Sequence, residues 1–257
     1  MLGKVFHILP AEILDIVMPR RCIACGRNLL VHEEHLCTWC RADLPLTFFW
    51  LQGRNAMADR FNLMLQREID RKVQEGEDVN PPGYAYAAAL FFYRSGTGYE
   101  KITQSLKYHA DIPAGRFFAR LLAERLRDCS FLGDVDAVVP VPLHWTRRWK
   151  RGYNQAEVIA SQLVESGIGG TMIPNLLIRN RRTRTQTKIS VRQKAGNVRG
   201  AFSVDPGTGR RYRGKLRSIL LVDDVFTTGA TLHECWKTLM EWDPDLHISI
   251  ATLGYVG

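Results

Sequence analysis

The chain of 257 residues lacks the long hydrophobic run that a membrane-spanning helix requires. Its longest uninterrupted run of apolar and aromatic residues, positions 84–93, is far shorter than the roughly 20 residues needed to cross a bilayer. The amino-terminal segment also lacks the apolar core of a secretion signal, because Pro10, Glu12 and Asp15 interrupt it. We therefore expect no membrane insertion and a cytoplasmic location, where cysteines usually serve as free thiols or metal ligands.

Acidic residues are missing from two stretches of the chain. Residues 143–155 contain Arg147, Arg148, Lys150 and Arg151 and no acid, and residues 179–199 contain eight lysines and arginines and no acid. Because the net charge of the whole chain is +9, the remainder is net acidic. A local basic surface suits a polyanion or a pyrophosphate group. A solvated basic loop is the alternative for the first stretch.

Four of the six cysteines form two CxxC pairs separated by eleven residues: Cys22, Cys25, Cys37 and Cys40. Each CxxC places two thiolates on one side of a tight turn, and two such turns complete a tetrahedron around zinc. A closed site with four cysteine ligands has no open position for a water, so the predicted zinc is structural. Disulfides are the alternative, and His32 and His35 lie between the pairs as substitute ligands.

The most informative stretch is residues 218–231, SILLVDDVFTTGAT, which lacks the lysine that a Walker phosphate loop requires after its second glycine. An apolar strand is followed by Asp223 and Asp224, then by a threonine- and glycine-rich loop and an amphipathic helix. A helix amino terminus binds phosphate, whereas paired carboxylates suit hydroxyl groups or magnesium. The pattern predicts a ribose 5-phosphate site with its phosphate at Thr227, Thr228, Gly229, Ala230 and Thr231. An ordinary strand, turn and helix with a threonine N-cap is the alternative.

Strand and helix patterns alternate along most of the chain. We expect strands at 84–93, 136–142, 176–178, 218–222 and 247–255, the last closing the sheet, and helices at 56–74, 99–108 and 115–128. This alternation predicts a parallel sheet, with the loops after Pro142, Ile178 and Val222 meeting at the carboxyl ends of its strands. Turn-forming residues at 76–83 mark a boundary. We expect a zinc ribbon with an amino-terminal helix in 1–55, a partly helical linker in 56–83 and an α/β domain in 84–257.

Residues 219–231 resemble, without a break, the phosphoribosyl pyrophosphate (PRPP) motif of type I phosphoribosyltransferases. The paired cysteines, LKYH, PVPLHWTRRWKRGYNQAE, RTRTQTKIS and NVRGAF extend the resemblance to the ComF/GntX family. That family joins a double zinc ribbon to a type I phosphoribosyltransferase fold. The resemblance implies a parallel sheet flanked by helices, preceded by a small zinc ribbon. It also implies a link to competence, DNA uptake and use of external DNA.

The first functional hypothesis from this resemblance is an enzyme, a pentosyl-transferring glycosyltransferase with an unidentified acceptor base. It would bind PRPP with magnesium, or a nucleoside monophosphate, and Asp223 and Asp224 would hold the ribose hydroxyls. In that family, residues 182–199 correspond to a lid. Pyrophosphate would be held by basic residues on the loops and on this lid: Arg147, Arg148, Arg151, Lys107, Arg184 and Lys188.

The second hypothesis is a nucleic-acid-processing accessory protein that binds single-stranded DNA or a DNA-uptake partner. Trp145, Trp149 and Tyr153 are interleaved with arginines, as in surfaces on which bases stack. Packing of these aromatic rings against the sheet is the alternative.

Overall fold

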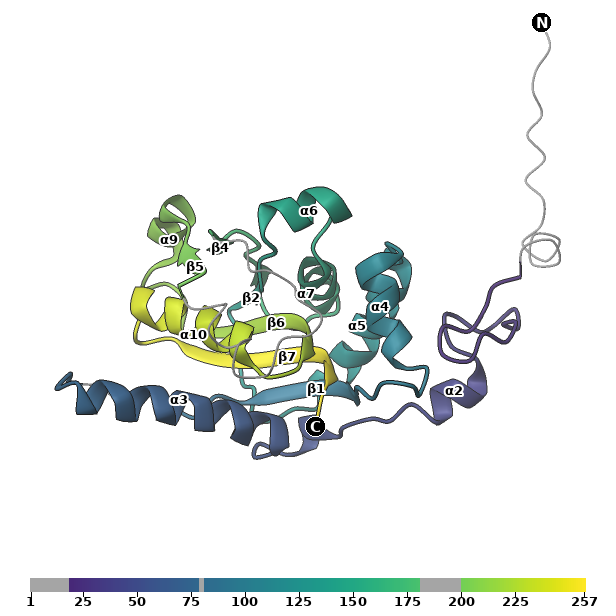
Figure 1. The fold of residues 1–257 in the computed structure, drawn as a ribbon, viewed down its shortest axis with the longest axis horizontal. Coiled ribbons are helices and arrows are strands. Elements are labelled where there is room, and N and C mark those ends of the chain that lie inside the picture. The colour runs from purple at the N-terminus through teal and green to yellow at the C-terminus, as the bar shows by residue number, and fades with distance from the viewer. Residues whose placement is uncertain (1–18, 79–80, 181–199) are drawn as a thin grey trace, which may run out of the picture.

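A computed structural model describes residues 19–78, 81–180 and 200–257 (Figure 1). Its centre is a five-stranded parallel sheet in the order β1 (Ala87–Phe92), β7 (His247–Tyr255), β6 (Ser218–Phe226), β2 (Ala137–Pro140) and β3 (Thr171–Met172). The apolar run at the start of β6, residues 219–222, is fully buried, as expected for a parallel strand covered on both faces. The predicted α/β fold, a type I phosphoribosyltransferase-like parallel sheet flanked by helices, is confirmed.

Helices cover both faces of this sheet. Chain connections run in opposite directions from β2 to β3 and from β6 to β7, and right-handed crossovers therefore place the intervening helices on opposite faces. One face carries α5 (Ile112–Leu126) and α7 (Gln155–Glu165), which pack against each other. The other face carries α10 (Ala230–Trp242) and α3 (Ala56–Gln74), which also contact each other.

Helix α3 matches the helix expected at 56–74. The Asn55 side chain caps it by accepting from the N–H groups of Met57 and Ala58, and donates to the Ala87 carbonyl of β1 at 2.9 Å. Met57 and Phe61 are fully buried. Burial of such side chains contributes roughly 1.5–3 kcal/mol each, so the helix is held to the sheet by its apolar face.

Three local features differ from the sequence-based expectations. The strand expected at 176–178 is β4 (Leu177–Arg179), which pairs antiparallel with β5 (Phe202–Val204) in a separate sheet. The main-sheet edge is already occupied by β3, so the loop after Ile178 does not follow a main-sheet strand. Strand β7 lies between β1 and β6 rather than at an edge. The loop after Pro142 contains a helix, α6 (Trp145–Arg151).

The cysteine-containing segment precedes the sheet and includes α2 (Thr38–Ala42) and the short helix η1 (Phe49–Leu51). Between them, Leu46 forms an antiparallel bridge with Phe91 of β1. Helix α4 (Glu100–Tyr108) follows β1, and α9 (Pro206–Tyr212) follows β5. The amino-terminal helix expected before Cys22 lies outside the described residues. Within the described ranges, every helix is too short or too polar to cross a bilayer.

Candidate functional site

The acidic pair lies at the carboxyl end of β6, inside the strand rather than after it. Pairing with β7 continues through Asp223 opposite Thr252 to Phe226 opposite Tyr255, which extends β6 beyond the predicted end at Val222. Successive strand residues point to opposite faces of a sheet. Asp224 therefore faces α4, where Lys107 contacts it. Asp223 faces α10. There, burial and, as the smaller cause, the charge of Asp223 raise the pKa of Cys235.

Lys107 is the counterion of this pair. Its Nζ lies 2.7 Å from Oδ2 of Asp224, and the Asp224 residue is only 7% exposed. Burial alone would lower the pKa of Lys107, but the Asp224 and Asp223 carboxylates outweigh it and raise that pKa. The lysine that we assigned to pyrophosphate binding thus contacts the acidic pair itself.

Asp223 has the more unusual environment. Burial, followed by the neighbouring Asp224 carboxylate, raises the pKa of Asp223 to about 7, against the lowering effects of the Asp224 N–H, Lys107 and Arg179. Its Oδ1 accepts from the Asp224 backbone N–H at 2.8 Å. A carboxyl group that gains or loses a proton near neutral pH can accept from a hydroxyl or donate to an oxygen.

The phosphate loop turns directly from β6 into α10. Gly229 has φ of 79°, in the left-handed region, and stands at the N-cap of α10. A Cβ there would lie 2.7 Å from Cζ of Phe226 and 3.1 Å from Sδ of Met64, so both the backbone and the packing require glycine. The Thr228 hydroxyl accepts from the Ala230 N–H at 3.4 Å. The first N–H groups of α10 and the exposed Thr227 form a polar turn that begins three residues beyond Asp224.

The predicted pyrophosphate arginines have different surroundings on α6. His144 caps this helix by accepting from the Thr146 N–H, which starts the helix directly after the β2 loop. Arg148 forms an ion pair with Glu157 of α7, and the Arg151 guanidinium lies 5.6 Å from the Tyr108 ring centroid. Arg147 is close enough to Arg179 to lower the pKa of Arg179. Arg184 and Lys188 lie outside the described residues.

Arg179, the last residue of β4, is a candidate site residue that the sequence reasoning did not single out. Its guanidinium lies over the Phe202 ring at 5.1 Å. Burial, then the charge of Arg147, lowers the pKa of Arg179, while Asp223 partly offsets these effects. It brings a positive charge from the two-stranded sheet toward the acidic pair. Its position at the start of the second acid-free stretch was the available signal.

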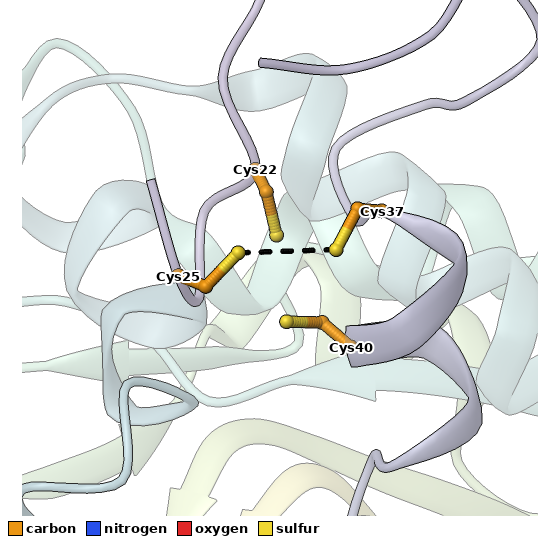
Figure 2. A group of neighbouring side chains, drawn as sticks. All are labelled: Cys22, Cys25, Cys37 and Cys40. Atoms are coloured by element: carbon orange, nitrogen blue, oxygen red, sulfur yellow. Dashed lines mark hydrogen bonds between the residues drawn. The ribbon is translucent and has the colours of Figure 1, made fainter. Parts of the chain in front are cut away.

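The four cysteines gather in one cluster, with their sulfur atoms turned toward a common centre (Figure 2). All four Sγ atoms lie within 4.8 Å of one another, and Sγ of Cys25 lies 3.8 Å from Sγ of Cys37. A zinc tetrahedron with bonds of about 2.3 Å has edges of about 3.8 Å, so the donor set fits structural zinc. Gly26, with φ of 76°, closes the first turn, and α2 carries Cys40. Among described residues, neither His32 nor His35 belongs to the cluster.

Glu33 ties the loop between the two cysteine turns to the start of α2, a role that the sequence does not predict. Its carboxylate accepts from the Leu30 N–H at 2.8 Å, the Thr38 N–H at 2.6 Å and the Thr38 hydroxyl at 2.7 Å. These bonds, from Leu30 first, lower the pKa of Glu33 to about 2. Its sequence context, an exposed-looking stretch of two glutamates between His32 and His35, gave no signal for this role.

No family model matches the chain, but its sequence is similar to those of several known proteins. Competence protein F of Haemophilus influenzae is 29% identical over 227 residues, 85% of this chain and 90% of that protein. DNA utilization protein YhgH of Salmonella typhi is 30% identical over 143 residues, 54% of this chain and 60% of that protein. Competence protein ComFC of Bacillus subtilis is 29% identical over 116 residues, 45% of this chain and 43% of that protein. These similarities, together with a four-cysteine cluster ahead of a phosphoribosyltransferase-like sheet, support assignment of the chain to the ComF family.

Proposed function

We propose that this protein binds PRPP with magnesium, or a nucleoside monophosphate, at the carboxyl end of β6, and that it acts in DNA uptake. The names of its relatives, competence and DNA utilization proteins, support the role in DNA uptake. One observation carries the ligand proposal. The pair of half-buried Asp223 and buried Asp224, with Lys107 as counterion, is followed at once by a glycine turn into α10.

Each part of this site has a chemical role in the proposal. Asp224, paired with Lys107, accepts hydrogen bonds from the ribose hydroxyls, and Asp223 accepts a second set or donates when protonated. The backbone N–H groups and hydroxyls of residues 227–231 hold the 5-phosphate. Arg147, joined by Arg184 and Lys188, holds the pyrophosphate. Magnesium would supply positive charge to the pyrophosphate oxygens.

Group transfer in this site would be a substitution at C1 of the ribose. The C1–O bond to pyrophosphate breaks and pyrophosphate leaves with the electron pair. A nitrogen of the acceptor base forms the new C1–N bond with its own electron pair and releases its proton to solvent. The positive charge that develops on the ribose is stabilised by the nearby carboxylates. The deciding property is therefore the negative charge of the acidic pair at the moment of bond breaking.

Calorimetric titration of the zinc-loaded protein with PRPP and magnesium tests the ligand proposal. We expect saturable binding that the double variant Asp223→Asn, Asp224→Asn abolishes, while Asp128→Asn, an exposed carboxylate beyond α5, leaves it unchanged. Unchanged affinity in the double variant would overturn the site assignment. Adding a panel of bases and following pyrophosphate release then separates an enzyme from a binding protein.

A second candidate function, contact with single-stranded DNA, rests on the surface formed by α6 and the end of α4. Trp145, Trp149 and Tyr108 are 69%, 88% and 71% exposed, beside the basic residues of α6. Exposed tryptophans between arginines suit base stacking with phosphate contact. The predicted third aromatic, Tyr153, is instead half-buried, with its hydroxyl donating to the Leu106 carbonyl.

Fluorescence anisotropy with a labelled oligonucleotide tests this second candidate. We expect affinity to fall steeply with salt. Trp149→Ala should weaken binding by roughly 5- to 160-fold, from a stacking contribution of about 1–3 kcal/mol. Leu63→Ala serves as the control. It removes an apolar side chain of α3 that is also exposed, since Leu63 is 52% exposed. Absence of binding at low salt would remove this candidate.

A further inference from the structure

Helix α4 joins the two predicted sites of this protein. Its first turn contacts the four-cysteine segment, and its last turn carries Lys107, which contacts Asp224. We propose that the zinc cluster positions Lys107 through α4, so that Tyr99 and Lys101 are positioning residues for the acidic pair and metal loading sets its affinity for ligand. The ligand part of this inference rests on the proposed function above.

The first turn of α4 is hydrogen-bonded to both cysteine turns. The hydroxyl of Tyr99, a residue only 6% exposed, donates to the Cys40 carbonyl at 3.2 Å and to Oδ2 of Asp43 at 3.0 Å. Nζ of Lys101 donates to the Ala24 carbonyl at 3.3 Å. Cys40 is one of the predicted zinc ligands, in the second cysteine turn. Ala24 lies in the first turn, between the predicted ligands Cys22 and Cys25. The acceptor positions therefore depend on the turn conformations that the metal fixes.

Gly98 adds a packed contact to these hydrogen bonds. It has φ of 89°, and a Cβ built there would lie only 2.6 Å from the Ala24 carbonyl oxygen. The first cysteine turn thus rests against the backbone that leads into α4. Gly96, two residues earlier, has φ of 83° but nothing within 4 Å of its Cβ position. Gly98 and Gly96 therefore have similar positive φ angles, but only Gly98 contacts the cysteine turn, so Gly96 can serve as its control.

The helix between the two ends is short and well packed. Its nine residues span about 13 Å. Ile102 and Leu106 are 1% and 0% exposed, and the Leu106 carbonyl accepts the Tyr153 hydroxyl. Gly115 of α5 leaves no room for a Cβ beside Leu106, since the nearest Leu106 methyl would lie 2.5 Å away. Such a helix moves as a body, and a shift of about 1 Å takes Lys107 from 2.7 Å out of hydrogen-bond range of Asp224.

Loss of zinc is expected to free the carbonyls that hold the first turn of α4. Lys107 then spends less time at Asp224, and the acidic pair carries more uncompensated charge. A ligand with a phosphate and a pyrophosphate binds such a site less well. Because coupling between two binding sites is reciprocal at equilibrium, PRPP with magnesium should raise the zinc affinity of the protein by the same factor by which zinc strengthens PRPP binding.

The test uses the double variant Tyr99→Phe, Lys101→Met, which keeps all four cysteines. Tyr84→Phe is the matched control, since the Tyr84 hydroxyl also donates to an aspartate, Asp59, at 2.6 Å. We expect the double variant to retain one zinc per chain and to show faster amide hydrogen exchange along α4 as far as Lys107. Exchange in α5 should be unchanged, and the Kd for PRPP with magnesium should rise about 5- to 20-fold. If the double variant does not fold, Gly98→Ala measured against Gly96→Ala replaces it.

The two readouts separate this inference from the proposed function. If exchange at the Lys107 end of α4 is unchanged both in the variant and in zinc-stripped protein, the inference is overturned. If PRPP binds wild type and variant equally, the inference is overturned and the ligand proposal stands. If exchange rises but wild-type protein binds no PRPP, the link from the zinc cluster to Lys107 stands and the proposed function fails.

Discussion

Replacing Asp223 by asparagine should make the protein more stable while removing ligand binding. The wild-type carboxyl group has a pKa raised from 3.8 to about 7 by burial and by Asp224. The folded state therefore holds this proton more tightly than the unfolded state does. Its ionisation opposes folding progressively as the pH rises from about 4 to about 7, and fully above that range. Asparagine keeps the acceptor that bonds the Asp224 N–H, and it carries no charge.

The size of the effect follows from the shift in the pKa of Asp223. A rise from 3.8 to about 7 corresponds to about 4 kcal/mol at 1.36 kcal/mol per pKa unit. Asparagine must itself be partly buried, so we expect Asp223→Asn to raise the free energy of unfolding by about 2–4 kcal/mol at pH 8. At pH 5 the carboxyl group is mostly protonated in the folded state, and the gain should fall below half of that value.

Thermal unfolding at pH 5 and pH 8 measures this difference. A gain of 2–4 kcal/mol corresponds to a rise in midpoint of about 5–12 °C for a chain of this length. Asp136→Asn is a control of opposite sign. The Arg217 and Ser218 N–H groups lower the pKa of Asp136, so this carboxylate is ionised and stabilising at both pH values, and its replacement should lower the midpoint by a similar amount at pH 5 and pH 8. An unchanged or lower midpoint for Asp223→Asn at pH 8, or an equal gain at both pH values, would refute the reasoning.

Two further predictions concern the cysteine segment and the phosphate loop. Glu33→Gln should speed zinc loss to a chelator at pH 7.5, since an amide cannot accept all three hydrogen bonds, whereas the exposed Glu34→Gln should not; equal rates would contradict the role of Glu33. Gly229→Ala should lower the unfolding midpoint more than Gly214→Ala, because both have positive φ but only Gly229 lacks space beside Phe226. We expect an extra loss of about 1–3 kcal/mol, measured by denaturant unfolding, and equal losses would contradict the packing argument.

Features encoded in a few adjacent residues were predictable from the sequence. The cysteine cluster follows from two CxxC pairs, because each pair forms its own turn. Residues 218–231 predict a strand, two acidic residues, a loop and a helix in that order. The structure places these parts consecutively on β6, the following turn and α10. Local geometry decides these features, so the local pattern was enough to predict them.

Features that depend on contacts between distant segments were not predictable in the same way. The apolar run before Arg179 predicts a strand, but its antiparallel partner lies beyond the second acid-free stretch, so its separation from the main sheet was missed. The sequence predicts a loop where α6 lies, because only the caps of this helix, His144 and Gly152, mark it. Lys107 and Asp224 are more than 100 positions apart, and only the packing of α4 against the sheet brings them together.

The arrangement around Asp223 also bears on why the site should have a ligand. Two adjacent carboxylates at the end of a buried strand oppose folding, and a single lysine contacts only one of them, Asp224. A structure serving stability alone would gain from an uncharged residue at Asp223. A ligand whose hydroxyls donate to both carboxylates would offset the unfavourable charge when it binds. We therefore infer that a polyhydroxyl ligand offsets the unfavourable charge at the acidic pair. Such a ligand should raise the unfolding free energy of the wild-type protein more than that of Asp223→Asn.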